Sequence, residues 1–302
     1  KGKKLLERIE PSSDFPAYKI KNPFTATVVK NECLTKDEEN NDTRHIVLDL
    51  GTSGFRYVEG QSVGIIPAGT DAKGKPFKQR IYSIASGSYG DDGKNQTLTL
   101  CIKRANTVDT QTGEIYKGVC SNYLCDSKEG DQVHCTGPLG RVLLMPQDEN
   151  TKLILLATGT GIAPFRGFLK TIFEQKKSWS GGVDLYFGGR YKKNALYLSE
   201  LNDEILQMKN ANIDFNIHYA FSNEDESKDG GRKYVQHSLE ENLDSVWSTI
   251  ESGNFSTYIC GLKGVDGGID EILSAYASQK GKDWAEMKET FKKEKRWNVE
   301  VY

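Results

Sequence analysis

The sequence predicts two domains of different class, an antiparallel β-barrel followed by an α/β domain built on a parallel sheet. Its 302 residues are about twice the length of an average domain. Short β-rich runs with little helical period fill the first half, whereas strands and helices alternate in the second. The charges nearly balance, with 40 Lys and Arg against 42 Asp and Glu, which argues against a nucleic-acid-binding protein.

The elements follow from these patterns in order. In the first half, turn residues separate six β-rich runs, at 24–30, 45–50, 61–66, 80–85, 97–103 and 132–136. Six such runs predict an antiparallel barrel or sandwich. In the second half, expected strands at 152–157, 183–187, 215–220 and 257–260 precede expected helices at 163–175, 196–208, 237–252 and 268–279. This alternation predicts a parallel sheet whose ligands lie beyond the carboxyl ends of its strands.

Residues 146–150 are the expected linker. They divide the chain into a domain over 1–148, with an N-terminal extension over 1–20, and a domain over 149–302. The longest apolar runs, such as 153–157, are far shorter than the roughly 20 residues of a membrane-spanning helix. Cys120 and Cys125 have no second close cysteine pair and no neighbouring His to complete four ligands, so no metal site is expected.

A glycine-containing turn follows the first expected strand of the second domain. Its sequence is Gly159-Thr160-Gly161-Ile162-Ala163-Pro164. Glycines allow a tight turn and close approach of a ligand, and Pro suits the first turn of a helix. The free amides of that helix would face an anion such as a pyrophosphate. On spacing alone, phosphate binding and a merely structural turn are equally supported.

Four other segments occur with this turn in a fixed order along the chain. They are Arg80-Ile81-Tyr82-Ser83, Gly118-Val119-Cys120-Ser121-Asn122, Cys260-Gly261-Leu262-Lys263-Gly264 and Trp297-Asn298-Val299-Glu300-Val301-Tyr302. The set resembles plant-type ferredoxin-NADP reductase from about residue 20 to the last residue. The resemblance implies an FAD-binding barrel, an NADP-binding α/β domain, and a flavin at their junction.

The resemblance assigns the FAD contacts largely to the barrel. Arg80, Tyr82 and Ser83 would bind the pyrophosphate, the ribityl chain and the isoalloxazine ring. The implied FAD-binding residues are Arg80, Ile81, Tyr82, Ser83, Cys101, Ile102, Lys103, Val119, Cys120, Ser121, Thr160 and Tyr302. One position departs from the photosynthetic members, because Thr107 stands where they place a Tyr against the FAD adenine. Tyr116 is the candidate substitute.

The NADP contacts implied by the resemblance lie mainly in the second domain. They are Ser83, Lys103, Thr160, Gly189, Arg190, Ser222, Asn223, Arg232, Tyr234, Gln236, Gly261, Leu262 and Glu300. Tyr234 would stack on the adenine, and Lys103 would reach the diphosphate. Asn223 stands in an acidic loop where the family commonly has an Arg. A less steep NADP preference is therefore expected, with Arg232, Lys233 or Lys228 compensating.

The implied catalytic residues are Ser83, Cys260, Glu300 and Tyr302. FAD links one-electron ferredoxin to hydride transfer because its semiquinone is accessible. Ser83 would hydrogen-bond near flavin N5, Glu300 would relay a proton through it, and Cys260 would pack against the nicotinamide so that hydride passes between C4 and N5. Strand alternation by itself places Glu300 and Tyr302 on one face. The resemblance adds that Tyr302 covers the flavin ring and moves aside for the nicotinamide.

Two basic clusters predict a docking surface for an acidic electron carrier. They hold Lys73, Lys75 and Lys78, and Lys292 and Lys293. A charge run by itself is more often a solvated face; the resemblance assigns these to ferredoxin, a 2Fe-2S protein, or to flavodoxin. It also implies a monomer in photosynthetic electron transport, located in a plastid, either in the chloroplast stroma or at the thylakoid periphery. A cyanobacterial cytoplasm is the alternative.

Other kinds of nucleotide-binding protein would show different sequence features. An NADH-dependent reductase of the cytochrome b5 type would be expected to lack the terminal Tyr. The reductase part of a diflavin enzyme would need an FMN module that 302 residues cannot hold beside two domains. A redox-inactive nucleotide-binding scaffold is the alternative from another class. The joint presence of Ser83, Cys260, Glu300 and Tyr302 argues against it.

Overall fold

The computed structural model describes residues 5–36 and 38–302. The contacts within the chain define two compact units. The barrel unit comprises Glu10–Arg141 and Arg166–Thr171, and the α/β unit comprises Val142–Phe165, Ile172–Tyr302 and, at the N-terminus, residues 5–9. Compared with the expected division after residue 148, residues 5–9 and 142–148 lie with the α/β unit, and residues 166–171 lie with the barrel unit.

The barrel unit contains a six-stranded antiparallel sheet in the order β4-β3-β8-β1-β2-β5. Its strands are β1 (Phe24–Cys33), β2 (Thr43–Asp49), β3 (Ser62–Ile66), β4 (Arg80–Ser83), β5 (Thr97–Lys103) and β8 (Gln132–Leu139). Each overlaps one of the six predicted runs. A bridge between Ile84 and Leu100 joins the two edges of the sheet, so that it closes on itself. The predicted barrel is confirmed.

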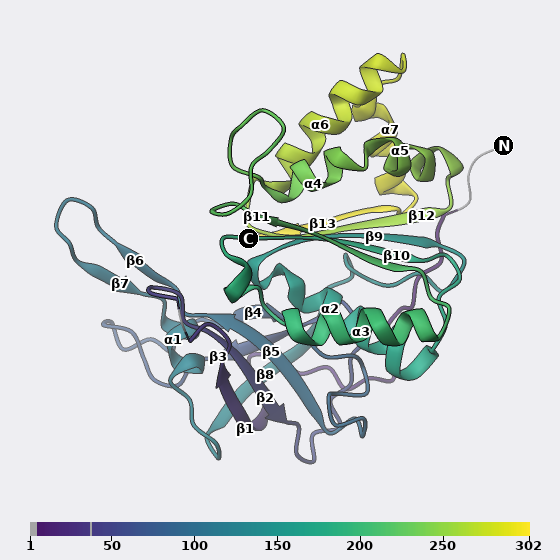
Figure 1. The fold of residues 1–302 in the computed structure, drawn as a ribbon. Helices are drawn as coiled ribbons and strands as arrows, with labels where there is room; N and C mark the ends of the chain where they lie inside the picture. Colours follow the sequence, from purple (N-terminus) through teal and green to yellow (C-terminus); the bar gives the residue numbers. More distant parts are fainter. Residues whose placement is uncertain (1–4, 37) are drawn as a thin grey trace. The chain divides into compact units, whose positions relative to one another are not determined.

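Three elements of the barrel unit were not predicted. Helix α1 (Val119–Cys125) packs on β5, and strands β6 (Asn106–Val108) and β7 (Ile115–Lys117) pair as a two-stranded ribbon that projects from the barrel (Figure 1). All six ribbon residues are exposed. Alternation of buried and exposed side chains is the sequence signal of a strand, and a ribbon without a buried face does not produce it.

The α/β unit contains a five-stranded parallel sheet in the order β11-β10-β9-β12-β13. Its strands are β9 (Lys152–Thr158), β10 (Val183–Gly189), β11 (Phe215–Phe221), β12 (Phe255–Gly261) and β13 (Trp297–Val301). The chain moves outward from β9 to β11 and then returns to the other side of β9 as β12. This reversal makes the carboxyl ends of β9 and β12 the place where a parallel sheet binds its ligand.

Helices cover both faces of this sheet (Figure 1). They are α2 (Ile162–Lys170), of which residues 162–165 belong to this unit, α3 (Leu198–Asn210), α4 (Val235–Glu241), α5 (Leu243–Ser252), α6 (Val265–Gln279) and α7 (Trp284–Lys293). α4 to α7 lie on one face and α3 on the other. The helix predicted over 237–252 is two helices, because the backbone leaves the helical conformation at Asn242. None of the described helices is both long and apolar enough to cross a membrane.

Candidate functional site

The ends of β9 and β12 approach each other so closely that only glycine fits. A Cβ atom on Gly161 would lie 2.2 Å from the carbonyl oxygen of Cys260. A Cβ atom on Gly261, whose φ is +155°, would lie 2.0 Å from Oγ1 of Thr158. That hydroxyl also accepts a hydrogen bond of 3.0 Å from the amide of Leu262. The two glycine segments are therefore one piece of packed main chain at the ligand-binding edge of the sheet.

The C-terminal strand extends this edge. β13 pairs with β12 so that Glu300 lies beside Cys260 in register. The amide of Tyr302 donates to the carbonyl of Gly261 at 3.1 Å, and the Tyr302 hydroxyl shares a hydrogen bond of 2.6 Å with Thr160. The last residue is held in place by these contacts, whereas its side chain remains 56% exposed. A fixed but accessible ring suits contact with a planar ligand.

Burial controls the ionisation of the two side chains that are paired here. Desolvation raises the pKa of the Cys260 thiol, and the negative charge of Glu300 raises it further. Desolvation also raises the pKa of the Glu300 carboxyl. The thiol is therefore neutral and suited to packing rather than to nucleophilic attack. Glu300 keeps its proton to higher pH than an exposed glutamate and can donate it.

The next two strand ends carry the remaining NADP candidates. Main-chain hydrogen bonds join Ser222 N to Gly189 O at 2.9 Å and Asn223 N to Arg190 O at 3.0 Å. After the loop that follows, Tyr234 precedes α4 with its ring 47% exposed. Gln236 lies against Gly268 of α6, and Leu262 is 63% exposed. The α/β unit thus brings together all its predicted NADP residues along one edge of the sheet.

The barrel unit brings the β4 and α1 candidates together. Tyr82 packs against the barrel core, and its hydroxyl interacts with the Cys120 thiol. Burial raises the pKa of Tyr82 and of Cys120, and the charge of Arg80 lowers the pKa of both. Ile81 is 56% exposed, and Ser83 is half-buried. Arg80 itself is exposed, so its guanidinium is available to an anion beside α1.

The turn into α1 is shaped by Gly118. A Cβ atom there would lie 2.9 Å from Oγ of Ser121 and 3.0 Å from the carbonyl oxygen of Ala105. The Ser121 hydroxyl accepts the amide of Ala105 at 3.0 Å and so holds this turn. The first hydrogen bond within the helix comes from Asn122 N, which leaves the amides of Val119, Cys120 and Ser121 to face a ligand.

The three candidate cofactor-binding residues on β5 differ in their exposure to solvent. Lys103 is exposed at the end of the strand, Cys101 is buried, and Ile102 is 1% exposed within the barrel core. The side chain of Ile102 cannot reach a ligand, so any contact it makes with FAD must come from its main chain.

The predicted docking lysines are all exposed. The carboxylate of Asp71 accepts the amides of Lys73 and Lys75 at 2.8 and 3.0 Å, so both lysines stand on a defined turn of the barrel unit. Lys292 and Lys293 lie in the last turn of α7. Arg296, the neighbour of this second cluster, differs: its guanidinium donates to the carbonyl of Phe255 at 3.0 Å and lies beside Glu294.

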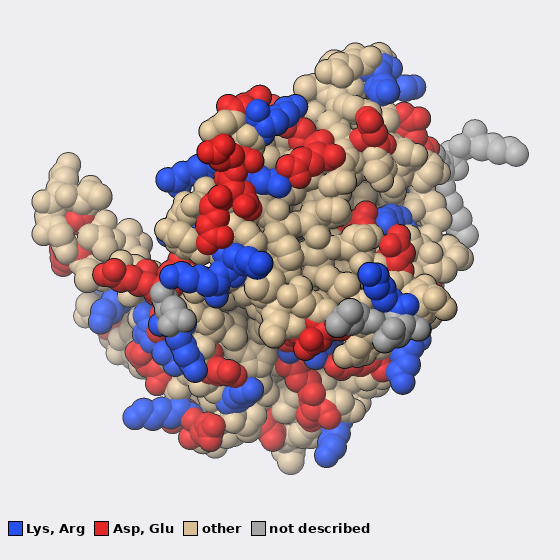
Figure 2. Space-filling model, viewed as in Figure 1, with Lys and Arg blue, Asp and Glu red and all other residues tan. Residues whose placement is uncertain are grey.

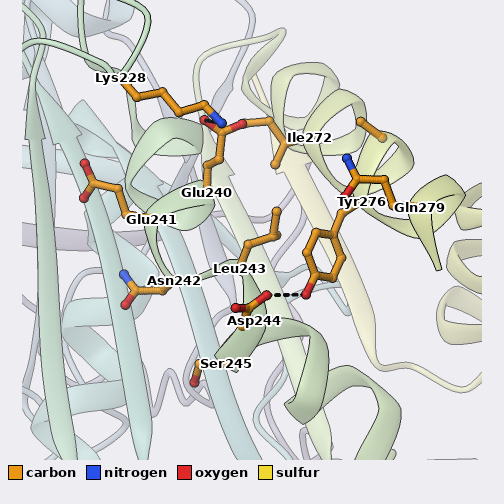
Figure 3. Close-up of a pocket in the computed structure, with 11 residues that line it drawn as sticks. Lys228, Glu240, Glu241, Asn242, Leu243, Asp244, Ser245, Ile272, Tyr276 and Gln279 are labelled. Atoms are coloured by element: carbon orange, nitrogen blue, oxygen red, sulfur yellow. Dashed lines mark hydrogen bonds and ion pairs between the residues drawn. The ribbon is translucent and has the colours of Figure 1, made fainter.

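A cavity of about 590 Å³ that the sequence did not indicate lies between α4, α5 and α6 (Figure 3). Lys228 and Glu240 form an ion pair of 3.2 Å in its wall, and the hydroxyl of Tyr276 donates to Asp244. Of the residues named from the sequence, Lys228, a candidate for the 2′-phosphate, lines it. Its polar groups are largely engaged with each other, and it is separate from the strand ends described above.

The chain is similar to known proteins along almost its whole length. Residues 155–270 match a family model described as an oxidoreductase NAD-binding domain. A ferredoxin–NADP reductase from Spirulina sp is 43% identical over 298 residues, which cover 96% of this chain and 99% of the relative. The chloroplastic leaf isozyme 1 of ferredoxin–NADP reductase from Arabidopsis thaliana is 43% identical over 290 residues, covering 94% and 79%. A solved structure of ferredoxin–NADP+ reductase from Plasmodium falciparum with 2′P-AMP gives a TM-score of 0.73 at 29% identity, covering 96% and 100%.

Proposed function

The chain belongs to the ferredoxin–NADP reductase family, and on this basis we propose that it binds FAD and NADP(H) and transfers electrons between NADP(H) and ferredoxin or flavodoxin. The observation that carries the proposal is the C-terminal edge of the α/β unit. There Glu300 and Tyr302 are held beside Cys260 and the two glycine segments. A scaffold that only binds nucleotides has no need of a desolvated carboxyl and an aromatic ring at its ligand edge.

The barrel unit fits FAD by its donors. The exposed guanidinium of Arg80 and the amides at the start of α1 suit a pyrophosphate. The turn that presents these amides requires glycine at position 118, because any side chain there would meet Ser121 and Ala105. Tyr82 contributes an aromatic ring on the same strand as Arg80. We assign the flavin to this group, with Ser83 hydrogen-bonding it near N5.

The α/β unit fits NADP by its shape and donors. The main chain at Gly161 and Gly261 offers a close approach to a ligand, and the exposed ring of Tyr234 suits an adenine. Ser222 and Arg232 supply a hydroxyl and a cation for a 2′-phosphate. Lys103 of the barrel unit is assigned to the diphosphate.

The proposed chemistry divides between the cofactor and the protein. FAD, when bound, supplies the link between two-electron hydride transfer and one-electron transfer. Burial raises the pKa of Glu300, so that it keeps its proton to higher pH than an exposed glutamate and would deliver it to the reaction. The neutral thiol of Cys260 packs against the nicotinamide and orients it. Tyr302 would cover the flavin ring and would move aside for the nicotinamide.

The direct test of the proposed function is electron transfer by the purified protein. It should contain tightly bound FAD and reduce cytochrome c with NADPH only when ferredoxin or flavodoxin is added. A protein that contains no flavin, or whose NADPH oxidation never depends on a one-electron carrier, would contradict the proposal.

Ferredoxin docking is proposed for the two lysine clusters because their charges are exposed and complementary to an acidic carrier. Lys75→Glu and Lys293→Glu should each raise the KM for ferredoxin about tenfold at low ionic strength, and less at high salt because salt screens the interaction. Lys282→Glu, at an exposed residue before α7, is the control. An unchanged KM for ferredoxin would remove that cluster from the docking surface.

We propose a plastid or a cyanobacterial cytoplasm as the location, since the relatives include chloroplastic and cyanobacterial enzymes. Fractionation of the source cells with an antibody against the chain tests this. Recovery with mitochondria or the endoplasmic reticulum would contradict it.

A further inference from the structure

The loop between β11 and α4 carries more negative than positive charge. Residues 222–233 include four acidic side chains and three basic ones. Figure 2 shows red and blue atoms interspersed over this part of the α/β unit. A net negative loop is a poor place for a phosphate dianion unless one of its cations is available to the phosphate.

Two of these carboxylates are occupied by main-chain amides. Asp225 accepts the amide of Phe221 at 2.9 Å, and Glu224 accepts the amide of Lys192 at 3.3 Å. Both acids therefore stabilise the start of the loop. These bonds fix the two carboxylates at the start of the loop but leave their charges in place, so a phosphate here needs a loop cation that is not already paired with an acid.

Two of the three cations are occupied as well. Lys233 pairs with Glu241 at 2.9 Å, and Lys228 pairs with Glu240 at 3.2 Å. Arg232 differs, since its Nη1 donates a hydrogen bond of 2.9 Å to Oδ1 of Asn223. Arg232 is thus the loop cation that is held by a neutral amide. Of the three residues expected to compensate for the missing Arg, only Arg232 keeps its charge available.

The fold of the loop brings Asn223 and Arg232 together across nine positions of sequence. Hydrogen bonds from Ser227 N to Gly231 O and from Lys233 N to Asp225 O close the loop at 2.8 and 3.1 Å. Asn223 is itself fixed to the end of β10 through the carbonyl of Arg190. The amide side chain therefore stands on an anchored main chain and can set the direction of the guanidinium.

We propose that Asn223 is a positioning residue that orients Arg232 toward the 2′-phosphate of NADP, so that one cation held by a neutral group sets the preference for NADP over NAD. The inference rests on the proposed function. An amide holds the guanidinium without cancelling its charge, whereas an isosteric aspartate would hold it and neutralise it. Ser222 precedes Asn223 in the chain and adds its hydroxyl to the same phosphate.

The test measures binding of 2′-phospho-AMP and of 5′-AMP to the FAD-loaded protein by isothermal titration calorimetry. Asn223→Ala should weaken 2′-phospho-AMP binding about fivefold and leave 5′-AMP binding unchanged. Asn223→Asp should weaken 2′-phospho-AMP binding by about tenfold or more, because it adds a charge at the site. Asn216→Ala is the matched control, since Asn216 also bonds charged side chains but at the opposite end of β11; it should change neither affinity.

A double-mutant cycle separates positioning from a general structural effect. In an Arg232→Ala background, Asn223→Ala should have no further effect on 2′-phospho-AMP binding. The inference is wrong if the loss persists in that background, if 5′-AMP binding falls equally, or if Asn223→Ala binds 2′-phospho-AMP like the wild type. If the wild-type protein itself binds 2′-phospho-AMP no better than 5′-AMP, the proposed NADP preference fails instead.

Discussion

The candidate site of the α/β unit is formed by closely packed main chain, whereas that of the barrel unit includes exposed side chains. In the α/β unit, the ends of β9 and β12 meet main chain against main chain at Gly161 and Gly261. In the barrel unit, the candidate flavin contacts also include exposed side chains, such as Arg80 on β4 and Tyr116 on the β6–β7 ribbon. Substitutions in the first region should change the shape of the protein. Substitutions of these exposed side chains should change contacts with a ligand and leave the packing of the protein largely unchanged.

The largest effect is expected from Gly161→Ala. The new methyl group would overlap the carbonyl of Cys260 at 2.2 Å, so β9 and β12 must separate. We expect the free energy of unfolding to fall by about 2 kcal/mol or more and NADPH binding to be lost, as measured by urea denaturation and calorimetry.

Gly267→Ala is the control for this substitution. Gly267 lies in α6 with no atom within 4 Å of the added Cβ, and alanine there should stabilise the protein by about 0.5–1 kcal/mol. If the two variants were equally stable, the close packing of the strand ends would not be what requires glycine at position 161.

An intermediate effect is expected from Glu300→Gln. The variant keeps the shape of the side chain and loses the proton, so ferredoxin-dependent turnover should fall about 100-fold. Glu251→Gln, at an exposed residue of α5, should leave turnover unchanged. Unaltered turnover in Glu300→Gln would remove Glu300 from the proton-transfer step.

Glu300→Gln should also change how the stability of the protein depends on pH. Desolvation raises the pKa of Glu300 above 4.5 in the folded protein, so the folded state binds this proton more tightly than the unfolded state. Its contribution to stability is present below about pH 4.5 and declines as pH rises through the folded pKa. Glu300→Gln should therefore be more stable than the wild type at pH 8, and this advantage should shrink toward pH 4. Urea denaturation at both pH values checks the sign; a variant less stable at pH 8 would contradict it.

The smallest effect is expected on the barrel side, from Tyr116→Ala. Thr107 and Tyr116 are directly opposite each other in the ribbon, so both side chains stand on one face. We propose that Tyr116, which is 54% exposed, stacks on the FAD adenine in place of an aromatic residue at position 107. Its loss should weaken FAD binding about fivefold to tenfold without lowering the free energy of unfolding of the FAD-free protein.

Fluorescence of released FAD measures this affinity. Tyr89→Ala, at another exposed tyrosine of the barrel unit, is the control, and Thr107→Tyr combined with Tyr116→Ala should restore tight binding. If FAD affinity were unaltered in Tyr116→Ala, the ribbon would have no part in holding the adenine.

The burial of side chains also explains which strands and helices could be predicted from the sequence. The six barrel strands and the first four parallel strands were predicted because each has a buried face or a buried run, as in β5 and β12. The β6–β7 ribbon has no buried face, and α7 buries only Trp284 and Phe291 among charged residues, so their patterns were weak. The Gly159 to Gly161 turn was identified, but its close approach to Cys260 depends on strand order and could not be predicted from spacing.

For the candidate site too, contacts between residues distant in the sequence could not be predicted. Residue types in a fixed order identified Glu300, Tyr302 and Arg80 as candidates. The hydrogen bond between Asn223 and Arg232 joins two ends of a loop, and the pairing of Lys228 and Lys233 with α4 depends on where that helix lies. Sequence alone therefore left three cations as equivalent candidates, and three-dimensional contacts distinguished them.

Stopped-flow reduction of the FAD-loaded protein tests the central claim most directly. NADPH and reduced ferredoxin, mixed separately with the protein, should each bleach the visible flavin absorbance at a rate at least as high as the steady-state turnover rate. NADH should bleach it much more slowly. A protein whose flavin is reduced by neither NADPH nor ferredoxin, or by NADH as rapidly as by NADPH, would contradict the account.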